Sequence, residues 1–274
     1  MPMLTQAKID QWYNEGYCVA TTFFTAAEVS ALQAEVKNLQ ERGKIRNVRT
    51  AGDGETYSDE KVNLQLCPAS PHSELIRALA YANKVTDTIT ALVGGPNILQ
   101  LDQIFLKPAG NGDGTNWHQD NAYFGAQNNA MGTGMWIAVH EANAANGTMC
   151  IIPNSYKGAL DHSRDPHSDH HIRCYPNEDQ AITIEVPAGG VLFFNYGIAH
   201  CTGPNTTTTD RAGLALHFHH ADIPLGPGHI RDKTTQIRPK IDGGDYGMTE
   251  YGVDLRGVFA HLVESYETTR LQQP

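Results

Sequence analysis

The sequence predicts an α+β protein, mainly β, in which a helical layer packs on a β sandwich or barrel. Two features of the 274-residue chain favour this class. Helical patterns dominate the first part, about residues 1–96, whereas from residue 97 short β-type runs alternate with Gly, Pro and Asn turns. Strands at this spacing are typical of sandwiches and barrels. We expect a single domain over residues 1–274, with a β core at about 97–225 and a C-terminal extension at about 226–274.

The N-terminal part is predicted as helix, strand, helix and, after a polar loop, a further helical stretch. Residues 5–15 place apolar side chains at helical spacing, and residues 17–24 are β-branched and aromatic. Thr25 followed by Glu28 forms a capping-box pattern, which predicts that the next helix begins at residue 26. Residues 71–94 form the further helical stretch. The β core contains six short apolar runs, at 97–108, 134–142, 147–153, 181–187, 189–197 and 212–220.

The charge and the cysteines narrow the functional classes. With 20 basic and 30 acidic residues the formal charge is −10, and nucleic acids and anionic membranes bind to basic faces. We therefore expect a small-molecule substrate, no nucleic acid and no membrane. The five cysteines are scattered and include no CxxC pair, which disfavours a disulfide framework or structural zinc and predicts a cytoplasmic protein. Nothing in the sequence indicates the oligomeric state.

Thirteen histidines raise the question of a metal site. Non-haem iron(II) oxygenases bind the metal through two histidines and one carboxylate. In β folds the first histidine and the carboxylate are commonly two residues apart, and chance alone is expected to give about one such pair in this chain. The sequence contains four, namely His72/Glu74, His118/Asp120, His167/Asp169 and His220/Asp222.

Sequence context separates these pairs. The pair at residue 72 begins a helix after a proline, and the pair at residue 220 is followed by loop residues. The pair at residue 167 lies in a polar insertion, where a rigid site is hard to hold, although its histidines could contact substrate. His118 and Asp120 instead follow a strong strand and have aromatic neighbours. Taken alone, this pair could still be an ordinary solvent-facing loop pair.

His200 supplies the third ligand that the pair needs, directly after the apolar run 189–197. Thr202 and Arg211 follow His200 at offsets of two and eleven. Arginine suits bidentate capture of a carboxylate, and a nearby hydroxyl adds a hydrogen bond. If the strand of His200 is antiparallel to the strand that begins near Arg211, both side chains can face one cavity. 2-Oxoglutarate fits such a site, because its oxo-acid end chelates iron(II) and its far carboxylate needs a cation.

Three segments resemble the phytanoyl-CoA dioxygenase family of iron(II)- and 2-oxoglutarate-dependent oxygenases, over a region from about residue 8 to about residue 225. They are NWHQDNAYFG (116–125), MWIAVHEANAANGTMCIIPNSYKGAL (135–160) and HCTGPNTTTTDR (200–211). The resemblance implies a double-stranded β-helix, a jelly-roll or cupin-like core. It also implies that His118, Asp120 and His200 are the catalytic iron ligands. Arg211 would bind the far carboxylate of 2-oxoglutarate, with Thr202 beside it.

The resemblance implies four more contacts with the cosubstrate. Trp136 matches a tryptophan that lines the cosubstrate pocket, and Gln103 matches a polar contact on the strand that leads to the motif. Lys61 matches an upstream lysine, and Asn116 could hydrogen-bond the same molecule. Ordinary alternatives remain for several of these residues. Trp136 could be a core residue, Gln103 and Lys61 exposed strand residues, and Arg211 a plain surface residue.

The implied activity is that of a dioxygenase. It would use O2 to couple the oxidative decarboxylation of 2-oxoglutarate to hydroxylation, or a related C–H oxidation, of a small-molecule metabolite, with ascorbate as a possible reductant. Related halogenases have a small residue where this chain has Asp120, so halogenation is disfavoured. Gly189-Gly190 replaces a Gly-Asp common in the family, which is expected to change only turn hydrogen bonds.

Three other classes stay open at this point. A non-catalytic cupin-like metal- or ligand-binding protein would share the architecture, but it would not need the Thr202/Arg211 pair. A zinc hydrolase with the same ligands would need a general base, and none is obvious in the sequence. A family member that has lost activity and binds a partner is disfavoured by the intact ligands.

The substrate is predicted only as a class. A CoA thioester would need a basic surface for its phosphates, and few basic residues border the expected entrance (Lys44, Arg46, Arg49 and Lys61). A smaller metabolite is therefore favoured. Segments 44–60 and 160–180 are lid candidates. The second contains His162, His167, His170, His171, Arg164 and Arg173, which either meet an anionic substrate or form a solvated loop.

Overall fold

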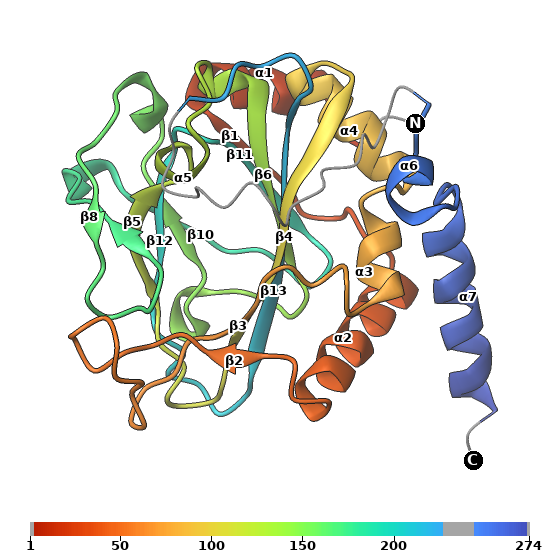
Figure 1. The fold of residues 1–274 in the computed structure, drawn as a ribbon, viewed down its shortest axis with the longest axis horizontal. Helices are drawn as coiled ribbons and strands as arrows, with labels where there is room; N and C mark the ends of the chain where they lie inside the picture. The colour runs from red at the N-terminus through yellow and green to blue at the C-terminus, as the bar shows by residue number, and fades with distance from the viewer. Residues whose placement is uncertain (1–2, 227–243, 273–274) are drawn as a thin grey trace.

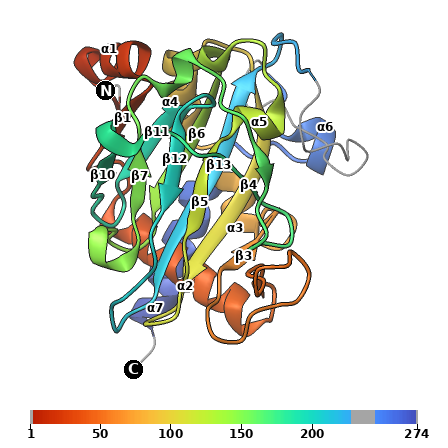
Figure 2. The same ribbon diagram turned by 90° about the vertical axis from the view of Figure 1, so that its left-hand side faces the viewer.

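A computed structural model describes residues 3–226 and 244–272 of the chain. Two antiparallel β-sheets face each other, and helices cover the outer face of the larger sheet (Figure 1). Turned by 90°, the molecule presents the smaller sheet in front of the larger one (Figure 2). The predicted α+β class, with a jelly-roll core and an N-terminal helical layer, is confirmed.

Seven strands form the larger sheet: β1 (Tyr17–Ala20), β2 (Arg46–Asn47), β3 (Leu64–Leu66), β4 (Asn97–Lys107), β6 (Gly132–Ala138), β11 (Val191–Asn195) and β13 (Arg211–His220). Their order across the sheet is β1-β11-β6-β13-β4-β3-β2. The smaller sheet contains β5 (Thr115–Gln119), β7 (Met149–Ile151), β10 (Ile182–Ile184) and β12 (Ala199–Thr202), in the order β10-β7-β12-β5. A separate pair joins β8 (Ser163–Arg164) to β9 (Ile172–Arg173).

The helices of the layer are α1 (Gln6–Glu15), α2 (Ala26–Glu41), α3 (Glu74–Leu79), α4 (Asn83–Val93) and α7 (Val258–Leu271). Two short helices are α5 (Asn121–Phe124), which lies outside this layer, and α6 (Met248–Tyr251), which lies next to α7 with Tyr251 packed against the same core (Figure 1). Four short 3-10 segments occupy Asn129–Met131, Ala144–Asn146, Ser155–Lys157 and Glu178–Gln180. None of the described helices combines the length and the apolar character that crossing a membrane requires.

Local sequence signals explain the helix boundaries. The Thr25 side chain accepts from the backbone N–H of Glu28, and the Glu28 carboxylate accepts from the N–H of Thr25, so the capping box at the start of α2 is confirmed. The predicted helical stretch 71–94 is interrupted between α3 and α4. Tyr81 lies in this interruption and is fully buried in the core.

Alternation along the strands produces two cores. In β6, Met135 and Ile137 belong to the core between the larger sheet and the helices. Trp136 and Ala138 belong to the core between the two sheets. Successive side chains of a strand point to opposite faces, and both faces of this sheet are covered, so its strands appear in the sequence as nearly continuous apolar runs.

The strands that carry His200 and Arg211 are not neighbours but belong to different sheets. β12 lies between β7 and β5 in the smaller sheet, whereas β13 lies between β6 and β4 in the larger one. Residues 203–210 connect the two sheets, as connections in a β sandwich commonly do. The two strands therefore face each other across the interior.

The described part of the C-terminal extension lies on the helical layer. Helix α7 packs against α2 and α3 (Figure 1). Phe259 and Val263 of α7 are buried in the same core as the helices that it covers. Residues 227–243 of the predicted extension lie outside the described residues.

Candidate metal and cosubstrate site

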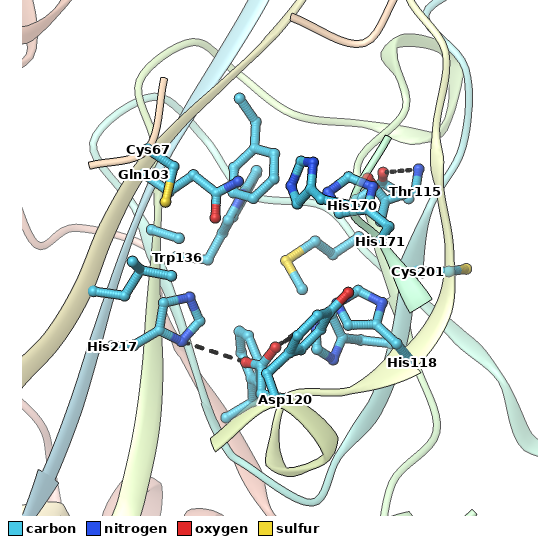
Figure 3. Close-up of a pocket in the computed structure, with 18 of the residues that line it drawn as sticks. Cys67, Gln103, Thr115, His118, Asp120, Trp136, His170, His171, Cys201 and His217 are labelled. Atoms are coloured by element: carbon cyan, nitrogen blue, oxygen red, sulfur yellow. Dashed lines mark hydrogen bonds and ion pairs between the residues drawn. The ribbon is translucent and has the colours of Figure 1, made fainter. Parts of the chain in front are cut away.

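A cavity of about 300 Å³ lies between the two sheets. Figure 3 shows His118, Asp120 and His217 on one side of this cavity, with Gln103 and His170 across from them. Strands β4, β6 and β13 of the larger sheet and β5, β7 and β12 of the smaller sheet contribute to its walls. The remaining wall comes from residues of α5, Cys67, His170 and His171.

His118, Asp120 and His200 converge on one point of the cavity wall. His118 in β5 and His200 in β12 are directly paired across the two antiparallel strands, and their ring centroids are 4.2 Å apart. Asp120 follows β5 at the start of α5. Its Oδ1 lies 3.7 Å from Nε2 of each histidine, and one ligand atom from each residue lies within 4.8 Å of the others. Two imidazoles and one carboxylate on one face are the donor set that suits non-haem iron(II).

Hydrogen bonds fix both imidazoles in the form that a metal requires. Nδ1 of His118 lies 2.8 Å from the carbonyl of Asn116, and Nδ1 of His200 lies 2.9 Å from that of Ile198. A carbonyl oxygen only accepts, so each Nδ1 donates, and in the neutral ring the Nε2 lone pair faces the other ligands. Burial is the main cause that lowers the pKa of His118 to about 3 and that of His200 to about 4.

The cavity wall also contains a buried cation, Arg211, and a hydroxyl group, that of Thr202. Arg211, 1% exposed, donates from Nε to the carbonyl of Asn146 at 3.3 Å and from its guanidinium to that of Gly147. Its Cζ lies 5.6 Å from the ring centroid of Trp136. Thr202 also lines the cavity, and its hydroxyl accepts from the backbone N–H of Thr115 at 3.0 Å. Arg211, Trp136 and Thr202, separated in the sequence, thus share one cavity, as predicted.

The remaining three predicted contacts have different outcomes. Gln103 lines the cavity and donates to Gln65 at 2.6 Å. Lys61 is exposed and does not line the cavity, which corrects the expectation for this residue. β3 begins only at Leu64, so it is Gln65 that this segment directs toward Gln103. Asn116 is also exposed, and its side chain donates to Asp165 at 2.8 Å, because it points to the other face of β5.

Lys107 and His217 are among the residues of the cavity wall that sequence reasoning missed. Lys107 is 2% exposed and lies on β4, four residues after Gln103. His217 is 6% exposed and lies on β13, six residues after Arg211. Residues separated by an even number share a face of a strand. This periodicity, applied forward from Gln103 and Arg211, was the signal that could have found both.

The two predicted lid segments contact each other at the cavity mouth. Asp169 accepts hydrogen bonds from the guanidinium of Arg46, from the hydroxyl of Tyr57 at 3.1 Å and from Nδ1 of His170 at 2.5 Å. The Thr50 hydroxyl donates to the carbonyl of Pro166 at 2.6 Å. Segment 160–180 is therefore packed against segment 44–60.

Histidines of this insertion face the cavity. His170 and His171 line it, and their ring centroids are 4.2 Å apart. His171 is 7% exposed, and burial lowers its pKa well below the ordinary value. His162 accepts from the backbone N–H of Gln119, next to His118. The insertion is thus part of the site rather than only a solvated loop.

Residues 12–213 match the phytanoyl-CoA dioxygenase (PhyH) family. A probable alpha-ketoglutarate-dependent hypophosphite dioxygenase of Stutzerimonas stutzeri is 28% identical over 239 residues, which cover 81% of this chain and 82% of that protein.

Solved structures share the fold. The non-heme alpha-ketoglutarate-dependent carbocyclase SnoK from nogalamycin biosynthesis superposes with a TM-score of 0.69 at 19% identity, covering 84% of this chain and 89% of SnoK. EctD from S. alaskensis, solved with 2-oxoglutarate and 5-hydroxyectoine, gives a TM-score of 0.64 at 19% identity, covering 81% and 78%. The chain belongs to the phytanoyl-CoA dioxygenase family of iron(II)- and 2-oxoglutarate-dependent oxygenases.

Proposed function

We propose that this protein is an iron(II)- and 2-oxoglutarate-dependent dioxygenase that hydroxylates, or otherwise oxidises at a C–H bond, a small-molecule metabolite. One observation carries the proposal. A single cavity of about 300 Å³ has a cluster of two histidines and a carboxylate on its wall and the buried cation of Arg211 elsewhere in the same enclosure. A short diacid with an oxo-acid head can engage both.

Each residue of the cavity has a defined task in this proposal. His118, Asp120 and His200 hold the iron, which when bound supplies the activation of O2. Arg211 and Thr202 bind the far carboxylate of 2-oxoglutarate. Trp136 packs against the guanidinium and closes the cavity beside it. The apolar walls exclude water from the reacting atoms.

The substrate is small or presents only a small part of itself to the cavity. The volume is at the lower end for ligand pockets, and 2-oxoglutarate must share it. Two of the four basic residues expected at the entrance are neutralised, since Arg46 pairs with Asp169 and Arg49 lies 2.9 Å from Asp113. These observations support a compact metabolite over a CoA thioester, whose phosphates need unpaired cations.

We further propose that residues 1–274 act as one catalytic unit in a reducing compartment such as the cytoplasm. The support for the compartment is that all five cysteines are free thiols.

The reaction class is tested by succinate formation from 2-oxoglutarate after anaerobically iron-loaded protein is exposed to air. We expect slow turnover without substrate, and a visible charge-transfer band that requires both Fe(II) and 2-oxoglutarate. Both signals should vanish in a His118→Ala/Asp120→Ala variant. Stimulation of turnover in a panel of small molecules, including ectoine and the P–H compound hypophosphite, would then identify the substrate and show whether a C–H or a P–H bond is oxidised.

Absence of both signals from the wild-type protein would reject the oxygenase. A protein that binds metal but neither binds nor consumes 2-oxoglutarate would instead be the cupin-like binding protein that the sequence left open.

A further inference from the structure

Two buried cations, not one, lie in the cavity, and they are neighbours. Arg211 and Lys107 are directly paired across the antiparallel strands β13 and β4. Lys107 is 2% and Arg211 1% exposed, and both line the cavity. Within the described ranges neither forms a salt bridge. Keeping both groups charged without a counterion is costly, so an anion that binds beside them is favoured.

Counting hydrogen-bond donors gives the same result. The ammonium group of Lys107 has three N–H bonds, and two of them donate to the carbonyls of Gly147, at 3.1 Å, and Gly203. Arg211 has five N–H bonds, and it donates to the carbonyls of Asn146 and Gly147. The remaining N–H bonds of Lys107 and Arg211 are not used by these carbonyls, and a carboxylate offers about four lone pairs to accept them.

We infer that Lys107 is a second ligand of the far carboxylate of 2-oxoglutarate and, with Arg211, makes the site selective for a 2-oxo acid that ends in a carboxylate. This inference rests on the proposed function. Lys107 supplies a point charge and Arg211 a planar fork, and both groups donate to the carbonyl of Gly147, so one carboxylate can meet both. The carbonyls of Gly147 and Gly203 hold the ammonium group in place before the cosubstrate arrives.

The electrostatics of the ligand-free site are consistent with this role. Burial lowers the pKa of Lys107 well below its ordinary value, and Arg211 lowers it further. Asp113, Cys201 and Cys150 act in the opposite direction. An incoming carboxylate favours the charged amine, so binding of 2-oxoglutarate restores the ammonium form of Lys107. The amine is thus charged most completely when the cosubstrate is present.

The test compares two ligands of equal length, 2-oxoglutarate and 2-oxopentanoate, which has a methyl group in place of the far carboxylate. Dissociation constants are measured under anaerobic conditions with Mn(II)-loaded protein, so that no turnover is needed. Lys107→Gln keeps amide N–H donors for the two glycine carbonyls but removes the charge. Lys157→Gln, at an exposed surface lysine that donates to Asn154, is the matched control.

We expect Lys107→Gln to weaken 2-oxoglutarate binding about 10- to 100-fold, as for the loss of a charged hydrogen bond, while 2-oxopentanoate changes less than about twofold. Lys107→Arg should restore part of the preference. Because the result is a ratio of two affinities in one variant, general loosening of the fold cancels.

Two outcomes would overturn the inference. An unchanged ratio in Lys107→Gln, or equal loss of both ligands, would make Lys107 a structural tie between the loops that carry Gly147 and Gly203. Failure of the wild-type protein to bind 2-oxoglutarate at all would be a different result, because it would reject the proposed function itself.

Discussion

Nδ1 of His217 lies 3.4 Å from Oδ2 of Asp120, the carboxylate oxygen that is not shared between His118 and His200. Neither atom has a hydrogen-bond partner among the described residues, although both are buried. The separation is longer than an ordinary hydrogen bond, so the contact is weak in the ligand-free site. A metal bound through Oδ1 of Asp120 would leave Oδ2 uncoordinated, and Nδ1 of His217 lies beside that oxygen. We expect His217 to orient Asp120 by donating from Nδ1 to this oxygen once a metal is bound.

Replacing His217 should lower metal affinity. We expect His217→Phe to weaken Mn(II) or Fe(II) binding about 10- to 100-fold, the usual cost of losing a residue that orients a ligand. His217→Asn, whose amide N–H can replace Nδ1–H, should recover most of the affinity. Titration calorimetry with Mn(II) measures both. His219→Phe, on the same strand but outside the cavity lining, is the control. Equal losses in the two phenylalanine variants would show that His217 only packs.

Metal binding should be nearly independent of pH between 7 and 5.5. Burial lowers the pKa of His118 to about 3 and that of His200 to about 4, so both rings stay neutral as the pH falls through this range. Protons compete with the metal only near the lowered pKa values. Two ordinary histidines of pKa ~6.5 would lose roughly 70-fold in affinity over the same interval. Mn(II) dissociation constants at both pH values decide between these profiles, and a loss of that size would contradict the buried, neutral pair.

Gly213 makes room for Trp136 beside Arg211. A Cβ at Gly213 would lie 2.8 Å from the indole ring of Trp136, closer than van der Waals contact allows. Gly213→Ala should therefore push the indole out of place, lower the free energy of unfolding by about 1–3 kcal/mol and weaken 2-oxoglutarate binding. Urea unfolding and ligand titration measure the two effects.

Two further variants separate the crowding from other effects of alanine. A Cβ at Gly158 would meet no atom within 4 Å, and its backbone is extended, so Gly158→Ala should be neutral. Gly213→Ala combined with Trp136→Phe should regain much of the lost stability, because the smaller ring removes the overlap. If the double variant is less stable than either single one, the crowding explanation fails.

Asp169 should hold the two lid segments together. Asp169→Ala removes the acceptor of Arg46, Tyr57 and His170, so both segments should open more often. We expect trypsin to cleave about tenfold faster within 44–60 and 160–180, where arginines are available, while 2-oxoglutarate affinity stays within about twofold. Asp161→Ala, at an exposed position of the same insertion, is the control. A parallel loss of cosubstrate affinity would show that the lids support the whole cavity.

Local patterns account for the correct part of the sequence prediction. The capping box at Thr25 and Glu28 acts within one helical turn, so the sequence alone predicts where α2 begins. Strand alternation is equally local. It places Gln103 on the inner face of β4, and two-residue spacing in His-x-Asp brings Asp120 to the end of the strand that carries His118.

Relations between distant segments were harder to predict from the sequence. The sequence left the relation between the strands of His200 and Arg211 as a condition, and these residues share the cavity because the two sheets face each other. Lys61 was assigned because it resembles an upstream lysine of the family, but the loop before β3 leaves it exposed, and Gln65 reaches the interior instead. Loop length and strand order are set by packing between distant segments, which no local pattern records.

The sequence by itself determined the residue types, their spacing and the strand faces, and so it identified the three candidate metal ligands and Arg211. Only the tertiary structure decided which side chains join them. Hydrogen-bond register places Lys107 opposite Arg211, strand order brings His217 to Asp120, and the contacts of Asp169 bring His170 to the cavity. Lys107 and Arg211, like Asp120 and His217, lie far apart in the chain, and their proximity comes from sheet pairing and core packing rather than from any local signal.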